Sequence, residues 1–168
     1  GGMPRNYQLT SVVGDGNDNY YVTGRERKGM TGTAEKVSIA EDFLLVKFHQ
    51  HQPGKLWRRW MLAAGTPEDR EWGTQLQVLK NGDLLVAGNF QGRMVMKGRD
   101  LNKGNKEQSL PRLLGSSGQG ALDSTTDDYE GFVARLNPNG SLLWAQTSGY
   151  FGNDFTKLLT VQMDVDGN

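Results

Sequence analysis

The sequence predicts an all-β fold built from short antiparallel strands, and three observations support this. The chain of 168 residues contains 23 glycines, where average usage gives about 12. These glycines lie between short apolar runs, which is typical of many strands joined by turns. Two kinds of hairpin then recur along the chain, each with similar turn residues. One domain with a hydrophobic core fits this length.

The first kind of hairpin occurs at 8–24 and 74–88, and its first half recurs at 159–168. Each copy has an alternating apolar run, a turn of Asn, Asp and Gly, and, in the first two copies, a second apolar run that ends in glycine. Asn, Asp and Gly tolerate the positive φ angles of tight turns. The third copy ends within its turn, at Asn168.

The second kind of hairpin occurs at 42–57 and 130–144, with a turn containing Pro and Gly and a second strand that carries Trp57 or Trp144. In units of four strands, the order gives two blades and the first strand of a third, which is part of a β-propeller. The predicted units are 1–64, 65–149 and 150–168. We expect Val22, Val46, Val86, Val133, Trp57 and Trp144 in the core.

The two copies differ mainly in one connection. Residues 25–41 link the hairpins of the first unit, whereas a polar, Gly/Ser-rich insertion at 89–130 links those of the second. Surface loops tolerate such added length because closure entropy grows slowly with loop length. Loops on a rigid scaffold often carry recognition. We therefore expect a protein partner to contact the insertion through Leu110, Pro111, Arg112, Leu113 and Leu114.

The repeat resembles the bacterial SBBP-type β-propeller repeat. The similarity lies at Asp18–Gly24, Asn81–Gly88, Phe132–Trp144 and Asp166–Asn168 and extends over about two thirds of the chain. It implies a scaffold or binding module of a secreted, periplasmic or cell-surface bacterial protein, or an accessory subunit of a larger complex. Two blades and one strand cannot close a propeller, so we expect either a longer polypeptide or several copies in one ring. Gly1 and Gly2 match glycines that follow the fourth strand.

Two alternative functions remain open. One is a carbohydrate-binding propeller in which Trp60 or Trp72 stacks on a sugar. The other is a fragment of a quinone-dependent dehydrogenase, because residues 139–144 also resemble the repeat of pyrroloquinoline-quinone propellers. We expect no enzyme, since the sequence contains no Ser-His-Asp spacing and no nucleotide-binding glycine loop.

Metal sites have candidates but also simpler explanations. Asp15, Asp18, Asp164 and Asp166 lie in Asp-rich turns, and alternating oxygen ligands with a glycine suit Ca²⁺. Turn chemistry explains the same residues, and the second copy has Lys80 where a carboxylate is needed. His49 and His51 lack a visible third ligand, so we expect solvated turn histidines and no cofactor.

Composition and charge argue against nucleic-acid binding, a membrane span and cysteine chemistry. Lys and Arg total 19, as do Asp and Glu, so the chain has no excess positive charge to release counterions from nucleic acid. No apolar run is long enough to span a membrane. Cysteine is absent, which excludes disulfides and thiol catalysis.

Overall fold

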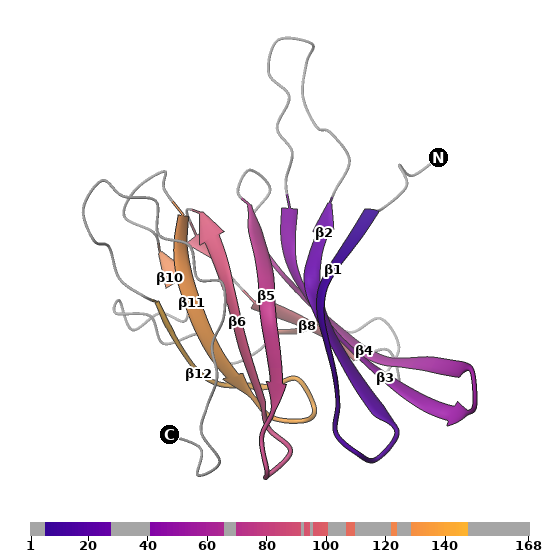
Figure 1. Ribbon diagram of the computed structural model, residues 1–168. Helices are drawn as coiled ribbons and strands as arrows, with labels where there is room; N and C mark the ends of the chain where they lie inside the picture. The colour runs from indigo at the N-terminus through magenta and orange to yellow at the C-terminus, as the bar shows by residue number, and fades with distance from the viewer. Residues whose placement is uncertain are drawn as a thin grey trace.

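The computed structural model describes residues 6–27, 41–65, 70–91, 93–94, 96–100, 107–109, 122–123 and 129–147. Every regular element in these ranges is a β-strand. The described residues contain no helix that is long and apolar enough to cross a membrane. Two antiparallel sheets account for most of the described chain and lie face to face (Figure 1). The all-β prediction is therefore confirmed.

The first sheet contains β1 (Asn6–Gly14), β2 (Asn19–Arg27), β3 (Glu41–Gln52) and β4 (Lys55–Ala64). Each strand pairs antiparallel with the next one in the chain. A β-bulge interrupts β1 at Thr10, and another interrupts β4 at Arg59. Each bulge shifts the in-and-out alternation of its strand by one residue.

The second sheet contains β5 (Glu71–Val78), β6 (Leu84–Gln91), β11 (Tyr129–Leu136) and β12 (Leu142–Thr147), in the order β12-β11-β6-β5. Its pairing repeats that of the first sheet. Even the first bulge recurs, at Thr74. Thr10 donates its hydroxyl hydrogen to the Thr23 carbonyl, 3.1 Å away, and Thr74 does the same to the Ala87 carbonyl, 3.2 Å away. Two predicted four-stranded units are therefore present as antiparallel sheets.

The insertion within the second unit has an unexpected position. Its strands β8 (Met96–Asp100) and β9 (Glu107–Ser109) extend the first sheet, because β8 pairs antiparallel with β4. The shorter strands β7 (Arg93–Met94) and β10 (Leu122–Asp123) pair with each other. Part of the insertion thus covers the β4 edge of the first sheet, an edge that would otherwise expose unpaired backbone groups.

Three turns explain why the chain reverses where the sequence predicts it. In each five-residue turn, the first amide donates to the carbonyl of the fifth residue, over 2.8–3.1 Å. The fourth residue has positive φ, between 59° and 84°. Glycine adopts this conformation at no steric cost, and Asp tolerates it. The fourth positions are Asp18 in turn 15–19, Gly82 in turn 79–83 and Gly140 in turn 137–141.

The core lies between the two sheets. Alternate residues of each strand point into it, as expected of a half-buried sheet. Its fully buried aromatic members include Phe43, Phe90 and Phe132, and the rings of Phe43 and Phe132 meet edge to face at 5.5 Å. We call the face of each sheet that points into this core its inner face, and the opposite face its outer face.

The predicted core residues have mixed outcomes. Val22, Val46 and Val86 are buried, which confirms them, whereas Val133 is half-buried. The prediction is wrong for Trp57, which is 54% exposed, and for Trp144, which is 37% exposed. Trp60, which the carbohydrate-binding alternative would place at the surface, belongs to the core and is 9% exposed. Trp60 lies opposite Lys47 and faces the second sheet, whereas Trp57 lies opposite His49 on the same face, farther out along the exposed hairpin.

Candidate functional site

The contact between the two sheets is the most specific arrangement in the described chain. At the end of the molecule that carries the three five-residue turns, Lys47 of β3 and Trp60 of β4 pair directly across the first sheet. Both donate hydrogen bonds to the Pro138 carbonyl of the second sheet, Trp60 from its indole Nε1 at 3.3 Å and Lys47 from Nζ at 3.4 Å. One turn of the second sheet is therefore held by two side chains of the first.

Gly140 makes this contact possible. A Cβ at Gly140 would lie 3.3–3.4 Å from three atoms of the Trp60 ring, and its φ of 83° favours glycine independently. The turn can therefore approach the indole face closely. On its other side, Trp60 meets the Tyr21 ring at a centroid distance of 6.2 Å. Such aromatic contacts stabilise beyond the area that they bury.

A half-buried cation accompanies this aromatic contact. The Lys47 Nζ lies 5.1 Å from the centroid of the Tyr21 ring, within the range of a cation–π interaction. Burial lowers the pKa of Lys47, and the Asp15 carboxylate partly opposes this. Burial also raises the pKa of Tyr21 to about 12, with a further contribution from the negative charge of Asp15. The Tyr21 hydroxyl is buried and has no acceptor within hydrogen-bond distance, although the Asp15 carboxylate is near enough to help raise its pKa.

Tyr21→Phe is expected to raise the free energy of unfolding at pH 7 by about 1 kcal/mol, because it removes a buried hydroxyl that makes no hydrogen bond. The folded protein binds the phenolic proton more tightly than the unfolded chain does, whose tyrosine titrates near pH 10. Because of Tyr21, the free energy of unfolding of the wild type therefore falls as the pH rises from about 10 to about 12. Urea unfolding of both proteins across this range measures the difference. If the Tyr21→Phe variant lost as much stability as the wild type over this pH range, the loss could not be due to the raised pKa of Tyr21.

The outer face of the second sheet repeats the inner face of the first. Across the first sheet, one row of paired residues contains Val13, Tyr21, Lys47 and Trp60. The corresponding row of the second sheet contains Gln77, Leu85, Arg135 and Trp144. A cation and a tryptophan thus pair in both rows. Trp144 corresponds to Trp60, and not to Trp57 as the sequence alignment suggested.

The two rows differ in what covers them. The β12 side of the second row is open to solvent, with Trp144 exposed and Gln146 beside it also exposed. Its β6 side is buried, with Leu85 at 2%. Arg135 donates from Nε and Nη2 to the Asp83 carboxylate at 2.9 and 2.8 Å. This ion pair holds Arg135 across its own sheet, whereas Lys47 reaches across to the neighbouring one.

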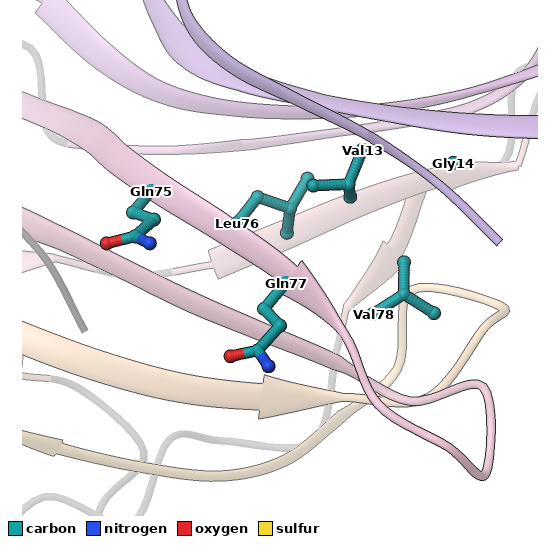
Figure 2. Close-up of a pocket in the computed structure, with 6 residues that line it drawn as sticks. All are labelled: Val13, Gly14, Gln75, Leu76, Gln77 and Val78. Carbon is teal, nitrogen blue, oxygen red and sulfur yellow. The ribbon is translucent and has the colours of Figure 1, made fainter. Parts of the chain in front are cut away.

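A shallow groove opens where the two sheets diverge. It has a volume of about 450 Å³ and is lined by Val13 and Gly14 of β1 and by residues 75–78 of β5. Figure 2 shows Val13, Leu76 and Val78 turned into the space between the two strands, whereas Gln75 and Gln77 point away from it. The groove continues the apolar core to the surface, and its lining contains no titratable side chain.

Buried carboxylates gather at the opposite end of the sheets. Glu41 accepts hydrogen bonds from Arg25 and Arg27 and forms an ion pair with each. Asp42 and Glu71 both approach Gly65, where an added Cβ would lie 2.8 Å and 2.6 Å from their carboxylate oxygens. Within the described ranges, no three His, Cys, Asp or Glu side chains form a group that could hold a metal ion.

Asp15 and Asp18 have structural roles in their turn. The Asp15 carboxylate accepts hydrogen bonds from the backbone amides of Asn17 at 2.8 Å and Asn19 at 3.3 Å, and from the Asn19 side chain at 2.8 Å. Burial tends to raise the pKa of Asp15, but these hydrogen bonds outweigh it and the pKa is lowered. Asn137 accepts the same two backbone hydrogen bonds in its own turn without a carboxylate. Turn formation therefore accounts for Asp15.

The other predicted site residues are dispersed. Trp60 is buried between the sheets, so its ring is not available to a sugar. Trp72 is half-buried on the outer face of the second sheet and meets the Tyr129 ring edge to face at 5.0 Å. His49 bonds Asn19 through Nδ1 at 3.1 Å, whereas His51 stacks on Trp57 at 5.0 Å. Asp164, Asp166 and Leu110–Leu114 lie outside the described residues, as do the predicted third unit 150–168 and Gly1–Gly2.

Comparisons with known proteins identify no relative: no family model, curated protein or solved structure matches the chain.

Proposed function

We propose that the two sheets are consecutive blades of a β-propeller and that the chain is a non-catalytic scaffold or binding module. The supporting observation is the repeated row. The cation and tryptophan by which the first sheet holds the second recur as Arg135 and Trp144 on the next face. A face that repeats in this way suits a further sheet of the same kind, and propellers are built by such radial repetition.

The same observation predicts how the next sheet would dock. Trp60 is covered by a turn that presents a carbonyl and a glycine, Pro138 and Gly140. Trp144 is expected to be covered by an equivalent turn, with its indole N–H on a backbone carbonyl. The further blades come either from a longer polypeptide or from other copies of the chain. In both cases the exposed indole of Trp144 becomes an interior residue of the assembly.

The setting of the module follows from the resemblance to the SBBP-type repeat. That resemblance favours a secreted, periplasmic or cell-surface bacterial protein, or an accessory subunit of a larger extracellular complex, whose partners are proteins. The insertion at 89–130 is the preferred contact for such a partner, with Leu110–Leu114 as the candidate residues. Two of its described strands, β8 and β9, extend the first sheet at its β4 edge.

Thiol labelling tests the proposed docking, because the natural chain has no cysteine. Gln146→Cys places a thiol on the exposed outer face beside Trp144, and Lys55→Cys places one on the exposed β3–β4 hairpin. In the complete assembly, maleimide should label position 146 much more slowly than position 55. Equal labelling would count against a docked blade. A cryo-EM map of that assembly would then show directly whether a four-stranded sheet covers Trp144.

A further inference from the structure

The β3–β4 hairpin extends beyond its counterpart in the second sheet. Twelve residues separate Lys47 from Trp60, whereas eight separate the equivalent Arg135 from Trp144. Figure 1 shows this hairpin projecting away from both sheets. Residues 51–58, which we call the hairpin tip, are all exposed. Since the rest of the fold repeats closely, this extension is a specific feature of the first sheet.

The base of the hairpin is braced, so the tip is presented on a firm support. The Gln50 amide donates to the Asp18 carbonyl at 2.8 Å. The Tyr20 hydroxyl donates to the Gln50 side chain at 3.0 Å. Pro53 and Gly54 form the reversal, and Gly54 takes the positive φ of 78° that the tight turn needs.

The tip exposes apolar side chains on both of its faces. Leu56 and Trp57 are 55% and 54% exposed. They are consecutive in β4 and therefore point to opposite faces, opposite Gln50 and His49 respectively. His51 stacks on Trp57 with ring planes 27° apart. A partner that contacts one flat face of the hairpin would leave the other apolar residue in water.

The hairpin is also cationic in a chain that is neutral overall. Lys55, Arg58 and Arg59 accompany the two apolar residues, and no Asp or Glu occurs between Lys47 and Trp60. The carboxylate of Asp15, in the turn that borders the base, is already engaged in hydrogen bonds. Positive charge on either side of two exposed apolar residues is complementary to an anionic surface with an apolar interior.

From this arrangement we infer that the hairpin tip binds the surface of a bilayer that contains anionic lipids. Leu56 and Trp57 enter the interface from both faces of the hairpin, and Trp57 lies at the level of the headgroups, where indoles are favoured. Arg58 lies behind the two apolar residues and Lys55 lies between Leu56 and the reversal, and their long side chains reach back to the lipid phosphates. The inference does not depend on the propeller assignment, because it uses only residues of the first sheet.

The experiment is sedimentation of the 168-residue chain with vesicles. Binding is expected to vesicles of equal parts phosphatidylcholine and phosphatidylglycerol at low salt, and much less to pure phosphatidylcholine. The double variant Lys55→Gln/Arg58→Gln should weaken binding about 30-fold, since each cation near such a surface contributes about 1 kcal/mol. Leu56→Ser/Trp57→Ser should weaken it at least about tenfold. Bromine-labelled lipid should quench tryptophan fluorescence of the wild type but not of the Trp57→Phe variant.

The control is Leu9→Ser/Val12→Ser, which removes two other exposed apolar side chains of the first sheet. It should bind vesicles as the wild type does. Circular dichroism should show that the tip variants remain folded, because their side chains are exposed. Failure to bind anionic vesicles, equal binding to neutral vesicles, or equal loss in the control variant would each overturn the inference. Binding to an acidic polysaccharide such as polygalacturonate without vesicle binding would also overturn it.

Discussion

Replacing Trp60 by alanine is expected to lower the free energy of unfolding by about 3–5 kcal/mol, the range for a large aromatic residue in a core. The indole fills the space between Tyr21 and the turn at Gly140, and it donates to the Pro138 carbonyl at 3.3 Å. Its removal leaves a cavity that a turn of fixed conformation cannot collapse to fill. Urea unfolding followed by circular dichroism measures the effect.

The internal repeat supplies the matched control. Trp144→Ala changes the equivalent residue of the second sheet, which is more exposed, and is expected to cost less than about 1 kcal/mol in the isolated chain. Trp57→Ala should be similarly mild. Trp60→Phe should destabilise the chain less than Trp60→Ala and more than Trp144→Ala, because it keeps an aromatic ring but loses the N–H donor. If Trp144→Ala destabilised the isolated chain as strongly as Trp60→Ala, its side chain would already be covered in solution.

The hairpins could be predicted from the sequence because their determinants are local. Asp15, Asn81 and Asn137 accept hydrogen bonds from amides two residues further along, in turns whose fourth residue has positive φ. These are properties of five consecutive residues, and the sequence displays them directly. The alternating apolar runs on either side then fix the four-stranded order, since consecutive strands joined by short turns pair with each other.

The tryptophan that faces the second sheet could not be predicted in the same way. The sequence aligns Trp57 with Trp144 because both follow a leucine and a Pro/Gly turn. The greater length of the first hairpin hides the correct match, in which the bulge at Arg59 corresponds to one at Leu143. A bulge changes which face a side chain occupies without a clear signal in composition. Pairing register was needed to place Trp60 beside Lys47.

The pairing of strands that lie far apart in the chain could not be predicted from the sequence either. Residues 96–100 contain no alternating pattern, yet they pair with β4, which ends 32 residues earlier. The candidate site at Pro138 has the same character: a carbonyl that accepts from Lys47 and Trp60 carries no side-chain signal at all. The repeat itself was the available clue, because Lys47 and Arg135 occupy equivalent positions in the two sheets.

Gly73→Ala is expected to destabilise the protein by about 3 kcal/mol, at the upper end of the range for overpacking. At Gly73 the backbone of β5 crosses the inner face of the first sheet. A Cβ there would overlap the Thr23 Oγ1 and lie 3.0 Å from the Phe43 ring. Thr23 cannot turn aside freely, because its hydroxyl donates to the Leu44 carbonyl at 2.8 Å. Thr10 also fixes β5 in place, since its hydroxyl hydrogen is shared between the Thr23 carbonyl and the closer Gly73 carbonyl, 2.6 Å away.

A double-mutant cycle separates this steric explanation from a general loss of backbone freedom. Thr23→Ala removes the closest atom and alone should cost about 1 kcal/mol, for one buried hydrogen bond. Combined with Gly73→Ala, the total should be smaller than the sum of the single effects by at least about 1 kcal/mol, because the two substitutions share one clash. Gly14→Ala is the control, since its Cβ would have no neighbour closer than 3.7 Å. Strict additivity at positions 23 and 73 would show that β5 does not pack on Thr23, and the face-to-face arrangement of the two sheets would then have to be abandoned.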